Sequence, residues 1–386
     1  MSQTIPVNNK IIKWARETSG LSIAEVARKL KKTSNDIKNW EQGISTPTYY
    51  QLEKLAYKIY KRPIVTFFFP EIPKENTPRA EFRTLPEEIV DTMPPEIIKL
   101  YRRAKVYQLN LNELDNEKLP KETRILENFE LSSISDQSKL AQAVRSFINT
   151  DIKTQISWKS LDEAVESWRS ALTSCGIYIF KDAFRNDQYS GLSIYDENYP
   201  VILINNSMPQ SRQIFSIFHE LGHLLYKAGG VDIIVESFYN RLNDDYLSIE
   251  QRCNQFAGEF LLPSDIFEAY HSDYSEKNIS EIANTYKVSR EVVLRKYLNF
   301  NLITPEIYKS YTEKWLKEYI DLRKRKKEIK PGGDHYNNKK LYLGEYYTNL
   351  AFSHYYQGKY NIETLADYLG MKVGNVPTFE GYVVMR

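Results

Sequence analysis

IFSIFHELGHLLY, at residues 214–226, combines a helical pattern of apolar residues with the motif H-E-x-x-H. On a helix, residues four positions apart lie on the same face, one turn above the other. His219 and His223 can therefore bind one Zn²⁺ from neighbouring turns, with Glu220 beside them. Two neutral imidazoles and one carboxylate leave a coordination position open for water. A bound metal lowers the pKa of that water, and a Glu that is not itself a ligand can take its proton.

Three features separate this motif from a chance match on a surface helix. Gly222 is a costly residue inside a helix unless something packs closely on it, and we expect a strand to cross there. A β-rich segment precedes the helix, and a candidate third carboxylate follows it. The chain has only 5 His, so two of them at this spacing are informative. The sequence thus predicts a metal site on this helix.

The composition is that of an ordinary soluble protein with two or three domains. The 386 residues carry a net charge of +2, with 42% hydrophobic and 26% charged residues. No apolar run is long enough to predict a membrane span, and the first residues lack the apolar core of a signal peptide. Cys175 and Cys253 make no disulfide framework, so we expect a reducing, cytoplasmic environment and no membrane partner.

The N-terminal region predicts a small helical domain. Ser22 and Glu25 form a capping-box pattern, which opens a short amphipathic helix. Another helix begins at Thr33 or Ser34 and ends at Gly43. Two short helices joined by a few residues, with polar side chains on the second, form a helix-turn-helix.

This module resembles the XRE/Cro type of helix-turn-helix in LSIAEVA (residues 21–27), WEQG (residues 40–43) and Pro47. Residues 1–62 hold twelve Lys or Arg against five Asp or Glu, and such an excess of positive charge suits a DNA phosphate backbone. The side chains expected to read a major groove are those of Ser34, Asn35, Lys38 and Asn39. The same module could instead bind protein, including a related helix-turn-helix.

A connector follows the first domain. Residues 63–70 are an apolar segment between prolines that we expect to pack, and more prolines up to Pro95 mark an irregular link. Helical periodicity then returns up to about residue 149 and predicts scaffold helices without catalytic residues. The expected domains are a helix-turn-helix domain, a connector, a domain around the H-E-x-x-H motif and a C-terminal helical region, at residues 1–72, 73–155, 156–265 and 266–386.

The region before the motif predicts one helix and a small antiparallel sheet. An amphipathic helix over residues 161–172 is followed by apolar strands at residues 177–180, 189–195 and 201–205. Residues 196–200 predict a hairpin turn between the last two strands. The expected fold class is α+β and mostly helical. This order of elements is typical of zinc-dependent peptidases, in which a sheet edge can hold substrate as an added strand.

The third metal ligand is expected on a helix downstream of the motif. Glu250 follows His223 by 27 residues and shares a helix face with Asn254, which could orient a ligand by a hydrogen bond. Glu259 is expected to face solvent, and Cys253 is expected to be a small core residue. The competing ligands that the sequence leaves open are Glu236, Glu259, Cys253, Asp244 and Asp245.

The motif and this downstream helix together resemble the ImmA/IrrE family of metallopeptidases. The residues that carry the resemblance are SRQIF (211–215), HELGH (219–223), Glu250 and CNQFAGEFLLP (253–263). Members often carry an XRE helix-turn-helix in front, as this chain does. Many members have an acidic residue and Ala before the Asn, whereas this chain has Arg252 and Cys253.

The resemblance implies a zincin-like peptidase and its site. By this likeness His219, His223 and Glu250 bind Zn²⁺, and Glu220 is the general base. The implied substrate is a protein partner, an XRE-type repressor. Its cleavage would relieve repression during stress, DNA damage or mobile-element induction.

SEIANTYKVSREVVL, at residues 280–294, has the pattern of a second helix-turn-helix, with its turn at Val288 and Ser289. The family resemblance implies that this piece packs against the peptidase domain. Contact with DNA is the other role that the pattern leaves open.

The remaining residues predict further helices. A long helix over residues 304–329 ends in the basic run RKRKK at residues 323–327, which suits either a solvated face or a nucleic-acid effector. His335 is a lone loop histidine and is not expected to bind a metal. Residues 344–369 predict a return to helical structure.

Two functions of different classes follow from these patterns. The first is a zinc-dependent endopeptidase that regulates transcription by cleaving a partner repressor. The second is a DNA-binding transcription regulator whose metal site is structural or latent. The complete motif favours the first, because a purely structural metal site has no use for Glu220.

Overall fold

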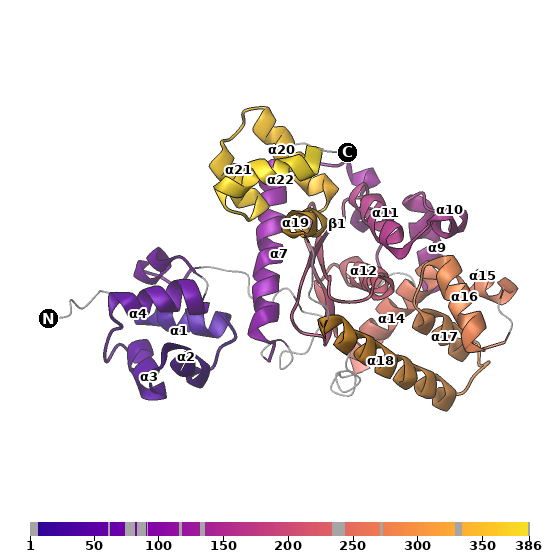
Figure 1. Ribbon diagram of the computed structural model, residues 1–386, viewed down its shortest axis with the longest axis horizontal. Helices are drawn as coiled ribbons and strands as arrows, with labels where there is room; N and C mark the ends of the chain where they lie inside the picture. Colours follow the sequence, from indigo (N-terminus) through magenta and orange to yellow (C-terminus); the bar gives the residue numbers. More distant parts are fainter. Residues whose placement is uncertain are drawn as a thin grey trace. The chain divides into compact units, whose positions relative to one another are not determined.

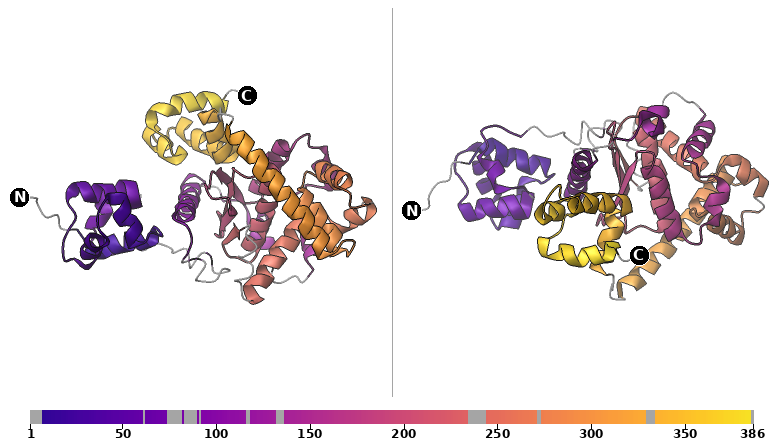
Figure 2. Two further views of the ribbon diagram at one scale, coloured as in Figure 1. Left: turned by 60° about the horizontal axis from the view of Figure 1, so that its bottom comes forward. Right: turned by 90° about the horizontal axis from the view of Figure 1, so that it is seen from above.

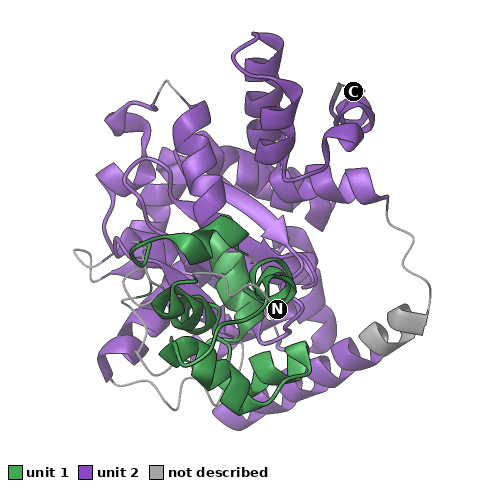
Figure 3. Cartoon of the chain, turned by 90° about the vertical axis from the view of Figure 1, so that its left-hand side faces the viewer, with its two compact units in different colours: residues 1–103 green, residues 104–386 purple. Residues whose placement is uncertain are grey.

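The computed structural model describes residues 7–60, 62–73, 82, 90, 92–115, 118–131, 136–233, 244–270, 273–328 and 334–384. The chain divides into two compact units, residues 1–103 and residues 104–386 (Figure 3). The finer division into four domains stays a prediction from the sequence.

The first unit contains a bundle of short helices around one apolar core. Its elements include α1 (Asn9–Thr18), α2 (Ile23–Leu30), α3 (Ser34–Gln42), α4 (Tyr49–Glu53), the π-helix η1 (Lys54–Tyr60) and the 3-10 helix η2 (Ile64–Phe68). Fully buried side chains from α1, α2, α3, α4 and η2 meet in the core: Ile11, Val26, Ile37, Leu52 and Phe67. Burial of this apolar face, more than helix propensity, stabilises such short helices.

Side-chain caps define the helix pair α2–α3. Ser22 accepts a hydrogen bond from the N–H of Glu25, whose carboxylate accepts the N–H of Ser22 at 2.8 Å. Thr33 and Asp36 cap α3 in the same reciprocal way. The end of α3 is Gly43, whose φ of 74° lies in the left-handed region that favours glycine. The capping box, the second helix start and the glycine end predicted from the sequence are confirmed.

The second unit consists of helices around a small sheet. Helix α7 (Pro95–Leu114) begins in the first unit and ends in the second. The helices that follow it, up to the end of the motif region, are η3 (Lys121–Thr123), α8 (Ile125–Asn128), α9 (Gln137–Phe147), α10 (Ile152–Ser157), α11 (Leu161–Thr173), α12 (Gln210–Leu225) and α14 (Asp244–Leu261). The α+β, mostly helical fold class is confirmed.

Four strands in the described residues form one sheet in the order β1-β3-β2-β4. They are β1 (Tyr178–Asp182), β2 (Tyr189–Ile194), β3 (Val201–Asn205) and β4 (Gly230–Ile233). Strand β2 pairs antiparallel with β3 and with β4, but β1 pairs parallel with β3. The sheet is therefore mixed and not purely antiparallel as expected, because the hairpin from β2 places β3 between β2 and β1. Strand β4 was not predicted.

Helices cover both faces of this sheet (Figure 1). On one face, a core shared with side chains of α11, α12 and α14 includes Ile179, Ile202 and Ile204. On the other face, Phe180 of β1 stacks on Tyr107 of α7 with the ring centroids 4.0 Å apart. Because both faces are covered, every residue of β1, β2 and β3 is buried.

The described residues after α14 form helices. They are α15 (Ser264–Tyr270), α16 (Glu276–Tyr286), α17 (Arg290–Asn299), α18 (Pro305–Glu328), α19 (His335–Leu343), α20 (Glu345–Tyr356), α21 (Ile362–Leu369), the 3-10 helix η4 (Val373–Asn375) and α22 (Val376–Val384). The helical structure expected at residues 344–369 is confirmed and consists of two helices, because the chain turns at Gly358 with a φ of 69° and Asn361 caps α21. Among the described helices, none combines the length and the apolarity that crossing a membrane requires.

Candidate metal centre

Helix α12 carries His219, Glu220 and His223 into the interior of the second unit. The helix packs against β2, β3 and β4 on one side and against α14 on another. Apolar side chains of α12, among them Ile217 and Phe218, are fully buried between these neighbours. His219, Glu220 and His223 are each 0% exposed, so their positions are fixed by the packing of the helix.

Gly222 allows α14 to approach the motif. A Cβ atom at this position would lie 3.0 Å from Sγ and 3.1 Å from Cα of Cys253, closer than ordinary van der Waals contact. The close neighbour of Gly222 is therefore α14 and not a strand as expected. This approach brings Glu250 of α14, which is 1% exposed, to the two histidines.

Three ligand atoms converge on one point. The Nε2 atoms of His219 and His223 are 3.1 Å apart, and carboxylate oxygens of Glu250 lie 3.4 Å and 3.3 Å from them. Ligands held tetrahedrally at about 2.0–2.1 Å from a zinc ion lie about 3.4 Å from one another, so these separations fit one shared cation. In addition, Oε1 of Glu250 is buried and accepts no hydrogen bond from the residues that the structure describes. Two His and one Glu are a donor set that suits zinc with one position open.

Asn254 orients His219 for this role. Its Oδ1 lies 3.0 Å from Nδ1 of His219, so the imidazole donates its proton there. The lone pair of Nε2 is then left facing His223 and Glu250. The hydrogen bond that the sequence suggested for Asn254 is thus present, while its effect on metal binding stays a prediction.

Neighbouring charges shift the pKa values of the three candidate ligands. Burial would raise the pKa of the Glu250 carboxyl, but the imidazoles of His223 and His219 outweigh it and lower this pKa to about 2. Burial acts to lower the pKa of both imidazoles, yet nearby acidic groups raise it above its usual value: Asp232 and Glu250 for His219, Cys253 and Glu250 for His223. A metal ion at this site would therefore compete with protons for the two imidazoles more than for Glu250.

Glu220 lies against the sheet beside the ligands. Its Oε2 accepts a hydrogen bond from Oγ of Ser193 at 2.6 Å, and its Oε1 accepts the N–H of Asp232 at 2.8 Å. A Cβ at Gly191 would lie 3.2 Å from Cγ of Glu220, so a glycine here allows β2 to approach. Burial raises the pKa of the Glu220 carboxyl, and the imidazoles of the centre act against this rise.

Strand β4 contributes residues that the sequence did not single out. A Cβ at Gly230 would lie 2.3 Å from Cγ of His223, so only glycine fits against this imidazole. The buried carboxylate of Asp232 accepts hydrogen bonds from Arg212 and Ser216, each at 2.8 Å, and from Ser190. The only signal in the sequence was the Gly229-Gly230 pair before a short apolar run, which is too weak to predict a strand.

The competing ligands lie elsewhere or outside the described residues. Glu259 does not face solvent as expected; it is buried and pairs with Lys296 at 2.6 Å and with Ser264 at 2.8 Å. Cys253 is fully buried in the core, as expected. Among the described residues, the group able to hold a metal comprises His219, His223 and Glu250. Of the remaining candidates, Asp244 and Asp245 are exposed at the start of α14, and Glu236 lies outside the described residues.

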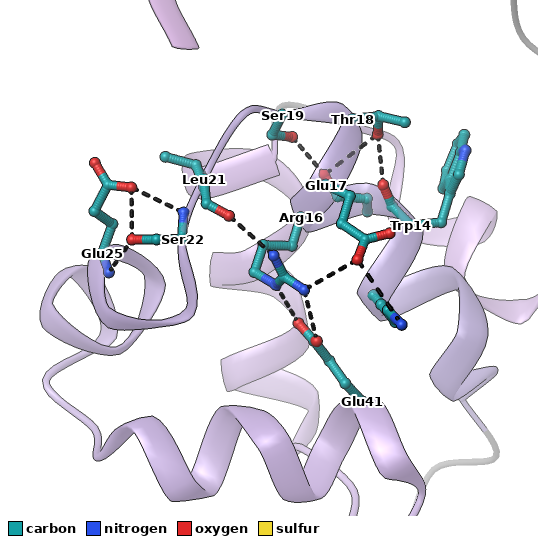
Figure 4. A network of polar contacts seen from close by, with 11 residues as sticks. Trp14, Arg16, Glu17, Thr18, Ser19, Leu21, Ser22, Glu25 and Glu41 are labelled. Atoms are coloured by element: carbon teal, nitrogen blue, oxygen red, sulfur yellow. Dashed lines mark hydrogen bonds and ion pairs between the residues drawn. The ribbon is translucent and has the colours of Figure 1, made fainter. Parts of the chain in front are cut away.

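In the first unit, an ion pair fixes helix α3 to α1 (Figure 4). Nε of Arg16 lies 2.6 Å from Oε1 of Glu41, and a second guanidinium nitrogen lies 2.9 Å from Oε2. Arg16 also donates to the carbonyl of Leu21, which precedes α2.

All four predicted DNA-reading residues lie on α3, with Ser34, Asn35 and Lys38 exposed and Asn39 half-buried. Their contact with DNA stays a prediction.

Helices α16 and α17 repeat the turn of α2 and α3. In each pair the first helix is followed by a lysine with a φ of 56°, Lys31 or Lys287. The next N–H donates back to the carbonyl of Ala27 or Ala283, at 2.9 Å and 3.0 Å. The second helix-turn-helix predicted from the sequence is therefore present as a local structure.

Helix α18 covers the second helix of this pair (Figure 2). The guanidinium of Arg290 lies over the ring of Trp315 and donates to Glu318 at 3.0 Å. The hydroxyl of Tyr308 donates to Glu291 at 3.0 Å. Two residues at the start of α17, Arg290 and Glu291, thus contact the chain's own α18.

The other sequence candidates add no ligand to the centre. The basic run at residues 323–327 lies in α18, and its side chains are outside the described part of the structure. His335 is exposed at the start of α19 and lies outside the metal-ligand group. The docking of a nucleic-acid effector on the basic run stays a prediction.

Comparisons with known proteins agree with the two motifs. Residues 173–297 match the family model of the IrrE N-terminal-like domain, a peptidase family, and residues 12–56 match a helix-turn-helix family model. None of the curated proteins matches the sequence. A solved structure of a Mycobacterium tuberculosis transcriptional regulator is 15% identical over 49% of this chain and 50% of that chain, with a TM-score of 0.29. The match spans about half of that regulator, and a likeness this small carries no argument about fold or function.

Proposed function

Since residues 173–297 form an IrrE N-terminal-like peptidase domain behind an XRE-type helix-turn-helix, we propose that this protein is a zinc-dependent endopeptidase that regulates transcription. Its substrate in this proposal is a protein, a partner repressor of the XRE type. The observation that carries the proposal is the convergence of His219, His223 and Glu250 at separations of 3.1 to 3.4 Å, beside Glu220. A peptidase centre needs both parts, a metal site with an open position and a free carboxylate next to it.

The chain's own residues have distinct tasks in this reaction. Zinc, when bound, supplies a Lewis acid that polarises the scissile carbonyl and activates a water. Glu220 accepts the proton of the attacking water and returns it to the leaving amine. The burial that raises the pKa of Glu220 suits this double role, because a carboxylate with a raised pKa is a stronger base toward the attacking water, and its acid form can still donate to the more basic leaving amine.

The burial of the centre bears on regulation. His219, Glu220, His223 and Glu250 are all buried, so a substrate peptide has to gain access before it can be cut. An enzyme that is latent until a partner or effector opens the centre fits this burial. The same observation favours the second candidate function, a DNA-binding regulator whose metal site is structural or latent.

The helix-turn-helix would bring the peptidase to its target. The exposed residues of α3 support binding to DNA near the repressor, and the likeness of the module to the repressor's own type supports direct binding to it. Single-stranded or duplex nucleic acid is then a candidate effector, through α3 or the basic end of α18.

The test is a cleavage assay on zinc-loaded protein with the helix-turn-helix protein encoded next to this gene, with and without single-stranded DNA. Wild type is compared with Glu220→Gln, whose single amide oxygen can accept from one of the two donors, Ser193 or Asp232, while its NH2 group cannot accept a proton. We expect the variant to retain zinc and to lose cleavage by roughly 10²- to 10⁴-fold, the usual contribution of a general base.

Three other outcomes decide between the alternatives. Cleavage by Glu220→Gln at the wild-type rate would contradict the mechanism. Cleavage only with single-stranded DNA would identify the effector. Zinc-loaded wild type that never cuts, but binds duplex DNA, would support the regulator with a latent site.

A further inference from the structure

The hydroxyl of Ser193 connects strand β4 to Glu220. Ser193 is fully buried on β2, and its Oγ lies 2.6 Å from Oε2 of Glu220. The same Oγ lies 3.0 Å from the backbone nitrogen of Gly230. An N–H group can only donate, so Oγ accepts from Gly230. The single hydroxyl hydrogen of Ser193 is then directed at Glu220.

A second donor holds the other carboxylate oxygen. The backbone N–H of Asp232 donates to Oε1 of Glu220 at 2.8 Å. One oxygen is thus fixed from β2 and the other from β4, which determines both the position and the plane of the carboxylate. Hydrogen bonds to an ionised acceptor are about twice as strong as those between neutral groups, so these two donors define one preferred orientation.

The position of β4 is itself fixed. Its Asp232 carboxylate accepts hydrogen bonds from Arg212 and Ser216 of α12, as well as from Ser190 of β2. The amide that holds Glu220 therefore cannot shift without breaking buried polar contacts, which is costly. The strand pair and α12 form one rigid support under the proposed general base.

We propose that Ser193 is a positioning residue of the peptidase centre. Its hydroxyl, together with the Asp232 amide, orients the Glu220 carboxylate toward the open position of the metal site, so that its free lone pairs can accept a proton from a group bound there. Ser193 itself touches neither substrate nor metal. This inference rests on the proposed function, since it assigns the role of a residue at the same centre.

The test uses two small probes in place of the protein substrate. Acetohydroxamic acid loses a proton as it binds a metal, and a correctly placed carboxylate can accept it. Azide is an anion without a proton to give, so its affinity reports on the metal alone. The ratio of the two affinities for the zinc-loaded full chain, measured by calorimetry, reports on the orientation of Glu220.

For Ser193→Ala we expect one zinc per chain, unchanged azide affinity and a roughly 10- to 100-fold loss of hydroxamate affinity, the usual effect of losing a hydrogen bond to a charged group. Ser193→Thr keeps the hydroxyl and should restore the ratio, while Ser193→Cys, with a weaker donor, should lie between. The matched control is Thr348→Ala, which removes a buried hydroxyl from the same unit that donates to the carbonyl of Gly344. We expect it to keep the ratio, because the hydrogen bonds of Glu220 and Asp232 are unchanged.

Several results would overturn the inference. If Ser193→Ala lowers the affinities for both probes by the same factor, or lowers neither, Ser193 has only a structural role. If Ser193→Ala fails to fold, Ser193→Cys takes its place. An unchanged ratio of hydroxamate to azide affinity in that variant would likewise leave Ser193 with only a structural role. Wild type that binds no zinc would remove the role altogether. Wild type that binds zinc and both probes but never cuts a protein would contradict the proposed function and leave the ratio test valid.

Discussion

The candidate metal centre and helix α3 place the side chains proposed to be functional in opposite environments. At the centre, His219, His223 and Glu250 are buried, and neighbouring groups hold Glu220 and Asn254 beside them. On α3, the side chains of residues such as Asn35 and Lys38 are exposed. A buried site depends on a few contacts that are each costly to lose, whereas a surface that binds DNA adds up many weak ones. Substitutions should therefore have large effects at the centre and small, salt-dependent effects on α3.

The largest effect is expected for Glu250→Ala. Loss of this ligand should lower zinc affinity by well over 100-fold, because changes to groups that only orient a ligand already cost about 10- to 100-fold. Competition with a chelator of known affinity measures it. Asp245→Ala is the matched control, since it removes an exposed carboxylate from the same helix. Equal zinc affinity in the two variants would move the third ligand away from Glu250.

Zinc affinity should also depend strongly on pH. The pKa values of His219 and His223 are raised, so without metal their imidazoles are protonated below these values, and zinc must displace the protons. Affinity should therefore fall as pH falls, by roughly tenfold per pH unit for each proton displaced. Glu250, with a pKa of about 2, adds nothing to this slope near neutral pH. Titrations with zinc between pH 5 and 8 measure the slope, and a flat profile would contradict the assignment of the ligands.

A smaller effect is expected for Glu41→Ala in the first unit. The change leaves the guanidinium of Arg16 without its main partner in a mostly buried place, which costs about 3 kcal/mol of the free energy of unfolding. Thermal unfolding followed by tryptophan fluorescence would show the loss, with zinc content unchanged. Glu17→Ala is the control, because Glu17 is half exposed and contacts Arg16 at 3.4 Å. Its effect should stay below about 1 kcal/mol. Equal losses in both variants would contradict the role given to the Arg16–Glu41 pair.

The smallest effect is expected for Lys38→Ala. Removal of one exposed charge from α3 should weaken binding to duplex DNA and reduce the slope of log affinity against log salt by about 1. Fluorescence anisotropy at several salt concentrations measures this slope. Lys372→Ala removes an exposed charge from the other unit and should leave it unchanged. If DNA binding is absent, or equal in both variants, α3 serves a protein partner instead.

The parts of this molecule that depend on local spacing were predictable. The H-E-x-x-H pair, the caps at Ser22 and Thr33, and the glycine end of α3 all follow from residues within one or two helical turns. Glu250 could be proposed as the third ligand because it lies on the next long amphipathic helix, and the structure places it beside the two histidines. The sequence also predicted the turn between α16 and α17, since the backbone geometry there is local.

The parts that depend on tertiary pairing were not predictable. Strand β4 has four residues and is defined by its pairing with β2, so no alternation marks it. Ser193 and Asp232 contact Glu220 only once that pairing exists. Glu259 looked exposed because its partner, Lys296, lies three helices further along the chain. In the same way, the cover of α18 over α17 could not be read from the helix-turn-helix pattern.

X-ray diffraction from crystals grown with zinc, measured on both sides of the zinc absorption edge, tests the central claim most directly. The account predicts one anomalous peak per chain, bonded to Nε2 of His219, Nε2 of His223 and a carboxylate oxygen of Glu250 at about 2.0–2.2 Å. It also predicts that Glu220 is not bonded to the ion and keeps its hydrogen bonds to Ser193 and Asp232. A peak at another group of residues, no peak at all, or Glu220 bound to the ion as a fourth ligand would contradict the account.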